Sequence, residues 1–547
     1  MEIKYFDIDG FDLVTGKEIK GLKTDTQNII RIEREVLPII FIPGVMASRL
    51  RNRAGKKAWD PDSIRFMVRK YGFITVTARK RKQLVIGKEF DAEYLQVINE
   101  DEEQRKKYLN AADKDREKRG WSGIFWETYG PFIEFLQDYK WSEAVYLCYE
   151  LPVHAFGYNW TASNADSGKK LKEYIDQVIS DYKNMDRKCE KVILVTHSMG
   201  GLVARAACKL HGAEGNVLGV LHGVQPAAGA ATGYWRMKGG FERPGSGPYK
   251  NVWDWFRNPI KMLKYKVAGY AAAWILGTDG EEVTSILANS PGCLELLPTK
   301  NYKPNGNNGS SAWLHVPKRD GMIMSLPKNG DPYEEIYSLN KDIYDRALFW
   351  RLVKPEWLDP VDVKASSKPG TNSAFELNDA WSLYIEALKQ AKEFHDNLGL
   401  DCHPSTYQFY STDRDTVDRI EFSRETGWRY NPEVSPHATS RGKYIAYVDK
   451  YDQEVDTPKD DQVYDRVQMA LPKNWKGGDG TVADSSGAIL KPDESTGGTA
   501  KISIHNSDDW FNNEHQDIYA TERARNLSIV AIENFAKSRI RELTGKK

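Results

Sequence analysis

The stretch VILVTHSMGGLV, residues 192–203, contains the residue whose type and setting best suit chemistry, Ser198. Four aliphatic residues predict a buried strand before it, and the pattern from Leu202 onward predicts a helix after it. A serine on such a sharp turn can act as a nucleophile, because the helix N-terminus stabilises developing negative charge. Gly200 supplies the small residue that the turn needs, whereas Thr196 stands where glycine is usual. We predict a nucleophile; the alternative is an ordinary turn that contains a serine.

A serine nucleophile needs an imidazole to accept its proton and a carboxylate to orient that imidazole. On α/β-hydrolase sheets these groups follow the serine in the order Asp or Glu, then His. GGDGTVADSSG (477–487) places Asp479 in a glycine-flanked turn, and FNNEHQDIY (511–519) places His515 before a closing helix. The order predicts a triad of Ser198, Asp479 and His515. Asp413 in YSTDRD is the alternative acid, and His505 in ISIHNSDDW is the alternative base.

Hydrolysis through such a triad also needs two backbone N–H groups that face the tetrahedral oxygen. One is expected from Met199, directly after the nucleophile. The other is expected from the loop IPGVMASRL (42–50), where Gly44 permits close approach and Val45 is the candidate donor, with Met46 next. A plain strand-ending Pro-Gly is the alternative for this loop. His197, beside the serine, is expected to pack within the core.

The hydrophobic pattern predicts the elements that hold these residues. Apolar runs of the kind that forms buried parallel strands occupy 36–44, 144–151 and 191–197. Helical patterns occupy 167–183 and 374–398, and another strand pattern follows at 405–412. Strands that alternate with helices indicate a mostly parallel, doubly wound sheet. The predicted class is α/β, with an α/β-hydrolase fold that carries a helical cap or lid insertion.

Four segments are predicted along the chain: an N-terminal extension (1–35), the first part of the core (36–224), the cap or lid insertion with connecting helices (225–400) and the second part of the core (401–547). Residues from about 225 to 300 are rich in Gly, Ala and Trp and lack strand periodicity. The aromatic residues of this segment predict a mobile lid whose aromatic face meets lipid; they are Trp235, Trp253, Trp255, Phe256, Tyr270 and Trp274. The alternative is a packed cap whose aromatic residues belong to the core.

Composition excludes several classes of protein. Lys+Arg and Asp+Glu both total 77, so the net charge gives no indication of nucleic-acid binding. Five cysteines without a C-x-x-C pair argue against a disulfide framework and a zinc site. Asp508 and Asp509 alone are too few ligands for a metal; no cofactor is expected, and no set of residues indicates calcium. The charged start MEIKYFDIDG lacks the apolar region of a secretory signal, and no apolar run could span a bilayer.

Several of these motifs together resemble one superfamily of lipases. IPGVMASRL, the YNW at 158–160, VTHSMGGLV, GGDGTV and the late EHQ are similar to the lecithin:cholesterol acyltransferase-like and GPI-inositol-deacylase-like lipases. The resemblance spans roughly 36–300 and 400–535. It implies an ester hydrolase, and it favours Asp479 over Asp413 as the triad acid.

A narrower resemblance is to antibacterial lipase effectors of type VI secretion systems. It is based on YNWTASNADSGKKL, GVLHGVQPAAGAATGYWRMKGGFE and EVTSILANSPGCLELLP. It implies a phospholipase made in the bacterial cytoplasm without a signal peptide and delivered into the periplasm of a target cell. The implied partners are membrane phospholipid, a cognate immunity protein and a secretion-needle component. Acyl transfer, a resident cytosolic esterase and an inactive binding or delivery module are the alternatives.

Overall fold

The structure is a computed structural model of the full chain of 547 residues. It describes residues 6–8, 11–13, 34–71, 76–87, 91–99, 114–241, 276–277, 279–305, 309–339, 348–360, 374–412, 414–431, 443–456, 458–459, 462–470, 477–490, 500–504 and 515–544. Five of the predicted lid residues, Trp253, Trp255, Phe256, Tyr270 and Trp274, lie outside these ranges, as do Asp413, His505, Asp508 and Asp509. The sixth, Trp235, is buried in the hydrophobic core, as the alternative for this segment predicts.

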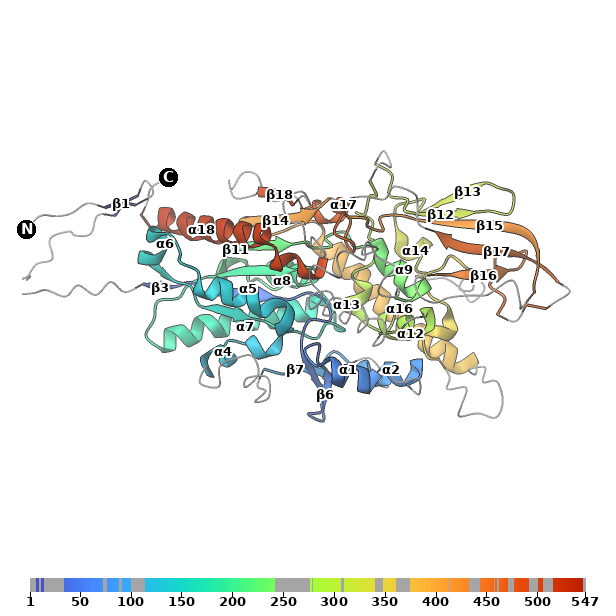
Figure 1. The fold of residues 1–547 in the computed structure, drawn as a ribbon, viewed down its shortest axis with the longest axis horizontal. Coiled ribbons are helices and arrows are strands. Elements are labelled where there is room, and N and C mark those ends of the chain that lie inside the picture. Colours follow the sequence, from blue (N-terminus) through green and yellow to red (C-terminus); the bar gives the residue numbers. More distant parts are fainter. Residues whose placement is uncertain are drawn as a thin grey trace, which may run out of the picture.

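A six-stranded parallel sheet forms one half of the molecule (Figure 1). Its strand order is β18 (Ala500–Ile504), β14 (Thr406–Ser411), β11 (Val217–Gly223), β10 (Val192–His197), β4 (Ile39–Ile42) and β9 (Val153–Ala155). Each strand runs parallel to its neighbours. β4 and β10 are buried along their whole length, which explains why both are uninterrupted apolar runs in the sequence.

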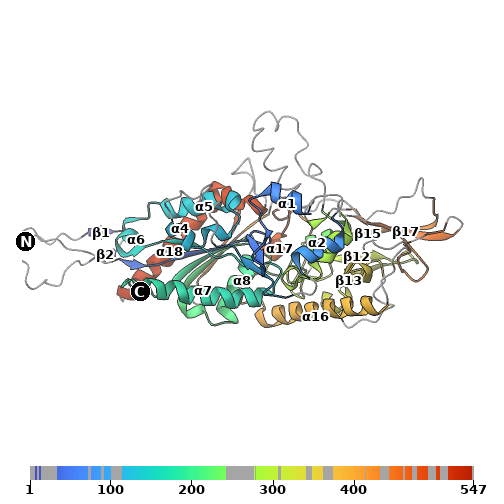
Figure 2. The same ribbon diagram turned by 90° about the horizontal axis from the view of Figure 1, so that it is seen from below.

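Helices cover both faces of this sheet (Figure 2). On one face lie α7 (Asn164–Asn184) and α8 (Gly200–Lys209), whose core includes Leu171, Leu202, Ile40 and Leu194. On the other lie α5 (Trp126–Asp138) and α18 (Glu522–Thr544), whose core includes Ile133, Phe535, Ile193 and Val195. Alternate residues of β10 therefore belong to two different cores. This three-layer arrangement is the doubly wound sheet that the sequence predicts.

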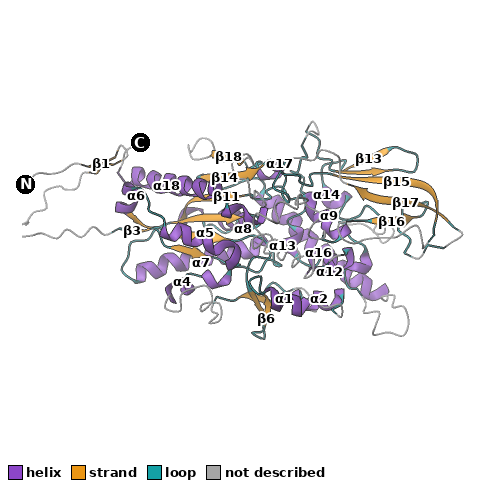
Figure 3. Ribbon diagram, in the orientation of Figure 1, coloured by secondary structure: helices purple, strands orange, loops and turns teal. Residues whose placement is uncertain are grey.

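A second, five-stranded sheet forms the opposite end of the molecule (Figure 3). Its order is β13 (Ile323–Leu326), β12 (Leu314–Pro317), β15 (Ile420–Arg429), β17 (Val463–Ala470) and β16 (Ile445–Val448). β12 and β15 run parallel, and the other neighbours run antiparallel. Between the two sheets lie α9 (Ala231–Gly239), α12 (Gly280–Leu287), α13 (Pro291–Leu294), α14 (Pro332–Glu335) and α16 (Ala374–Leu398).

Smaller elements surround these layers. The short strands are β1 (Phe6–Ile8), β2 (Phe11–Leu13), β3 (Glu35–Val36), β5 (Leu50–Asn52), β6 (Lys57–Trp59), β7 (Leu95–Val97) and β8 (Tyr149–Glu150). The short helices are α1 (Ile64–Tyr71), α2 (Ala78–Val85), α4 (Lys114–Lys118), α6 (Glu143–Cys148) and α17 (Asp484–Gly487). The 3-10 helices are η1 (Trp121–Gly123), η2 (Glu214–Asn216), η3 (Pro355–Trp357) and η6 (His515–Ala520).

Most of the predicted elements are present, and one is wrong. The helical patterns at 167–183 and 374–398 correspond to α7 and α16, and the strand pattern at 405–412 corresponds to β14. The predicted strand at 144–151 is instead helix α6, followed by the two residues of β8. α6 packs against α18, with Ala144 and Val145 buried and Tyr146 exposed. Packing against a helix has therefore overridden the β-propensity of this run.

The predicted segment boundaries remain predictions. Residues from 401 onward contribute β14 and β18 to the six-stranded sheet and β15, β16 and β17 to the five-stranded one. In the described part of the chain, no helix is sufficiently long and apolar to cross a membrane.

A buried carboxyl group lies at the start of α7, whose N-cap is Ser163. Glu295 is fully buried and hydrogen-bonds three groups: Ser163 Oγ at 2.6 Å, Asn164 N at 2.7 Å and Asn164 Nδ2 at 2.6 Å. Burial raises the pKa of Glu295 to about 8, although these three hydrogen bonds lower it. The acid form can place its proton on Oε1, which faces the Ser163 hydroxyl.

Replacing Glu295 by glutamine is expected to stabilise the protein at pH 8 and to have little effect near pH 4.5. Glutamine can keep all three hydrogen bonds but cannot ionise. The folded-state pKa of about 8 lies above the ordinary 4.5, so the free energy of unfolding of the wild type falls as the pH rises between these values. Denaturant titrations should show the difference in unfolding free energy growing by about 3–5 kcal/mol over this interval. A difference that does not change with pH would contradict this.

Candidate active site

Ser198 lies on a strained turn between β10 and α8. Its φ of 52° is in the left-handed region, and its N–H donates to Gly223 O at 2.9 Å. A Cβ on Gly200 would lie 2.5 Å from Pro43 O, so no side chain fits where the helix passes the loop after β4. Close approach of strand, loop and helix thus requires glycine at this position. The elbow that the sequence predicts is present.

The threonine that replaces the usual glycine has its own hydrogen bonds. Thr196 is fully buried, and its Oγ1 lies 3.0 Å from His222 Nδ1. Tyr519 Oη donates to Thr196 O at 2.8 Å. Burial lowers the pKa of His222 to about 3, so this imidazole is neutral at physiological pH. The departure at Thr196 is therefore accommodated within the core.

Residues from three distant segments meet at Ser198. Its Oγ lies 2.7 Å from His515 Nε2, and His515 Nδ1 lies 2.6 Å from Asp479 Oδ2. These distances fit an imidazole that donates its Nδ1–H to the carboxylate and accepts the serine proton at Nε2. His515 is the first residue of η6, and its backbone N–H donates to Asp479 O at 3.1 Å. The structure thus brings together the three residues that the sequence nominates.

The carboxylate of Asp479 is held by its own turn. Oδ1 accepts the backbone N–H of Thr481 at 3.0 Å and that of Val482 at 2.7 Å, which leaves Oδ2 for His515. Asp479 is buried, and the N–H of Gly480 donates to Thr416 Oγ1 at 2.8 Å. Each carboxylate oxygen therefore has a separate set of donors, and the side chain cannot rotate without losing one of them.

The loop after β4 approaches the nucleophile closely. A Cβ on Gly44 would lie 3.2 Å from Ser198 Cβ. In the described ranges, neither Val45 nor Met199 uses its backbone N–H in an intramolecular hydrogen bond. Met46, the alternative donor, has a φ of 63°. Two N–H groups without an acceptor among the described residues, one directly after Ser198 and one directly after Gly44, suit an oxyanion hole, and the assignment to Met199 and Val45 stays a prediction.

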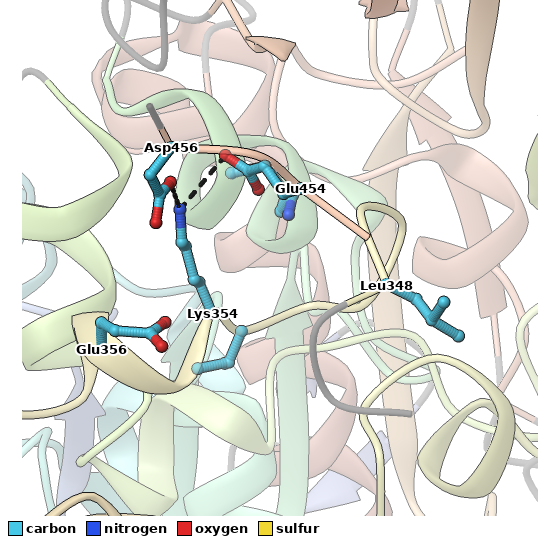
Figure 4. Close-up of a pocket in the computed structure, with 7 residues that line it drawn as sticks. Leu348, Lys354, Glu356, Glu454 and Asp456 are labelled. Atoms are coloured by element: carbon cyan, nitrogen blue, oxygen red, sulfur yellow. Dashed lines mark hydrogen bonds and ion pairs between the residues drawn. The ribbon is translucent and has the colours of Figure 1, made fainter. Parts of the chain in front are cut away.

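A mixed-charge pocket lies elsewhere in the molecule (Figure 4). Its lining comprises Lys238, Leu348, Val353, Lys354, Glu356, Glu454 and Asp456. Lys354 points toward Glu454, 3.4 Å away, and also forms an ion pair with Asp456. None of these residues belongs to the group around Ser198. Among the described residues, no cluster of His, Cys, Asp and Glu could hold a metal ion.

The sequence did not predict one side chain that lies close to Ser198 and His515. Tyr129, on α5, hydrogen-bonds His197 Nδ1 at 2.8 Å. No motif surrounds Tyr129, and it lies 68 residues before His197. His197 itself is buried beside the elbow, where the sequence places it.

The sheet and the Ser–His–Asp arrangement define an α/β-hydrolase-like fold with a serine elbow. A family model described as "PGAP1-like alpha/beta domain" matches residues 150–231, which run from β8 through the elbow into α9. A chain in the crystal structure of a Tle4–Tli4 complex matches with a TM-score of 0.65 and 24% identity, covering 92% of this chain and 99% of that one. These matches confirm the predicted α/β-hydrolase fold, and they agree with the resemblance that the sequence motifs indicate.

Two other solved structures match less well. They are lipase BlEst2 from Bacillus licheniformis in propeptide form, covering 80% of this chain and 69% of that one, and phospholipase PlaB from Legionella pneumophila, covering 63% and 77%. Both are 12% identical with a TM-score of 0.17, which is too low to support an argument. No curated protein sequence matches.

Proposed function

We propose that this protein is a serine carboxylester hydrolase that cleaves acyl esters of membrane glycerophospholipids. The observation that carries the proposal is the unbroken hydrogen-bonded chain Ser198 Oγ–His515–Asp479 on a strained elbow. The phospholipid substrate and the antibacterial role are supported by the motifs shared with type VI lipase effectors.

The geometry suits acyl transfer through a covalent intermediate. Ser198 Oγ attacks the ester carbonyl carbon while its proton moves to His515 Nε2, and Asp479 stabilises the resulting imidazolium. The oxyanion of the tetrahedral intermediate accepts hydrogen bonds from the backbone N–H groups of Met199 and Val45. The tetrahedral intermediate then collapses and breaks the ester bond, and His515 donates the proton to the leaving alcohol, a lysophospholipid. Water then attacks the acyl-enzyme with His515 as base, which releases a fatty acid and restores Ser198.

Purified protein incubated with phospholipid vesicles tests the reaction. The expected products are free fatty acid and lysophospholipid in equal amounts, detected by mass spectrometry. An acyltransferase would instead pass the acyl group to an added alcohol, so the products of a sterol or long-chain alcohol separate the two activities. An inactive binding module would release neither product.

We further propose that the protein is made in the bacterial cytoplasm and acts in the periplasm of a target cell. In the target cell its partner would be membrane phospholipid. Before delivery its partners would be a secretion-needle component and an immunity protein. The match to Tle4, solved with Tli4, supports a dedicated protein partner. No cofactor is part of the proposal.

Toxicity is expected to depend on compartment. Expressed with a periplasmic leader in a sensitive bacterium, the protein should cause lysis, whereas cytoplasmic expression should be tolerated better. The Ser198→Ala variant in the periplasm is the control and should be harmless. Colony counts and membrane-lipid profiles measure both effects. Unimpaired growth with active enzyme in the periplasm would count against an antibacterial role.

A further inference from the structure

A chain of buried hydrogen bonds lies behind the triad and connects a loop with three elements of secondary structure. His197 Nε2 lies 2.7 Å from the carbonyl oxygen of His515, and His197 Nδ1 lies 2.8 Å from Tyr129 Oη. Gly44 N–H donates to the same Tyr129 oxygen at 3.4 Å. The chain thus runs from the loop after β4, through α5 and the end of β10, to η6.

The direction of each hydrogen bond follows from the chemistry of the partners. The His515 carbonyl can only accept, so the proton of His197 is on Nε2. Burial, followed by the nearby His515 side chain, lowers the pKa of His197 to about 3, against the opposing effect of its hydrogen bond to the His515 backbone. The imidazole is therefore neutral, and its Nδ1 accepts the Tyr129 O–H. The phenol oxygen remains free to accept from Gly44.

We propose that His197 and Tyr129 are positioning residues, which together fix the main chain of His515 and the oxyanion loop relative to Ser198. This inference rests on the proposed function. Its basis is that the chain holds the main chain at two positions where catalysis needs accuracy. One is His515, whose side chain accepts the serine proton; the other is Gly44, directly before the donor Val45.

Packing alone does not account for this arrangement. The His197 and Tyr129 side chains are 3% and 1% exposed, yet each uses its polar atoms on a partner in a different element. A Cβ on Gly44 would lie 2.7 Å from His197 Nδ1, so the loop touches the imidazole directly. A neutral His197 also avoids placing a second positive charge beside the imidazolium that forms on His515, whose ring centroid is 5.1 Å away.

Three variants separate positioning from stability. His197→Leu removes both hydrogen bonds of the imidazole. His197→Gln can keep a donor near the Nε2 position for the His515 carbonyl but loses the acceptor for Tyr129. Tyr129→Phe keeps the ring and removes the link to Gly44. Tyr384→Phe is the matched control, because Tyr384 is also fully buried and its Oη donates to a backbone carbonyl, Tyr337 O, at 2.9 Å.

The assay is hydrolysis of a soluble short-chain ester, with the melting temperature measured for each variant. His197→Leu should lower kcat by about 100-fold with KM within about 2-fold, because a displacement of about 1 Å at a catalytic group costs that much. The kcat of His197→Gln should be at least about 10-fold higher than that of His197→Leu. Tyr129→Phe should lower kcat by about 10-fold relative to the wild type. Tyr384→Phe should lower the melting temperature by about as much as Tyr129→Phe does, without changing kcat.

Two results would overturn the inference. One is a kcat of Tyr129→Phe and His197→Leu within about 2-fold of the wild type. The other is a glutamine variant no more active than the leucine variant at the same melting temperature. Failure of the proposed function looks different, because wild-type protein would then fail to react with a fluorophosphonate at Ser198.

Discussion

Replacing Ser198 by alanine is expected to lower the rate of ester hydrolysis by about 10⁴- to 10⁶-fold, as loss of the nucleophile does in serine hydrolases. The fold should survive, because the N–H of residue 198 can still donate to Gly223 O and the Gly200 contact is unchanged. Covalent labelling by a fluorophosphonate, followed by intact mass, should disappear in the same variant.

A second serine provides a matched control for this experiment. Ser338 is also buried and also lies in the left-handed region, with a φ of 67°. Ser338→Ala therefore imposes a similar backbone demand outside the site, and this variant should keep full activity and full labelling of Ser198. Retention of most activity or label in Ser198→Ala would show that Ser198 is not the nucleophile.

Asp479→Asn is expected to lower kcat by about 10⁴-fold, although it changes only one atom. The turn fixes the orientation of the new amide, because its carbonyl oxygen must stay with the N–H groups of Thr481 and Val482. The amide NH₂ then faces His515 Nδ1 and donates to it. This forces the proton of His515 onto Nε2, which can no longer accept from Ser198.

Kinetics of single and double variants check this explanation. Asp479→Asn combined with His515→Ala should lose hardly more activity than His515→Ala alone, since the triad acts as a unit. Asp413→Asn, at the alternative acid, should leave kcat within a few-fold of the wild type. Loss of activity in Asp413→Asn with normal activity in Asp479→Asn would move the acid to Asp413.

The sequence predicts the triad residues and three strands of the six-stranded sheet, β4, β10 and β14, because these have short-range signals. Ser198 and Asp479 lie in turns whose glycines are visible within a few residues, and β10 is an apolar run. The alternatives Asp413 and His505 could not be set aside from local sequence, because position relative to Ser198 depends on how distant strands pair.

Features that depend on distant contacts were not predicted. Nothing near Tyr129 in the sequence indicates that it meets His197, and the run 144–151 has strand propensity although α18 holds most of it as a helix. The five-stranded sheet was missed for a related reason. In β15, burial alternates only over the first few residues and the rest is largely exposed, so the period that marks a strand fades.

The positions of Ser198 and His515 along the sequence determine when a chain under synthesis can form the hydrogen bond between them. Ser198 and His515 are 317 residues apart, and the neighbouring strand β18 and the covering helix α18 lie close to His515 in sequence. At about 5–20 residues per second, a ribosome needs about 15–60 s to pass from the nucleophile to its base. During that interval the growing chain carries Ser198 without a proton acceptor. A cell that makes this protein therefore acquires the arrangement of Ser198, Asp479 and His515 only after the segment from β18 to α18 has been translated.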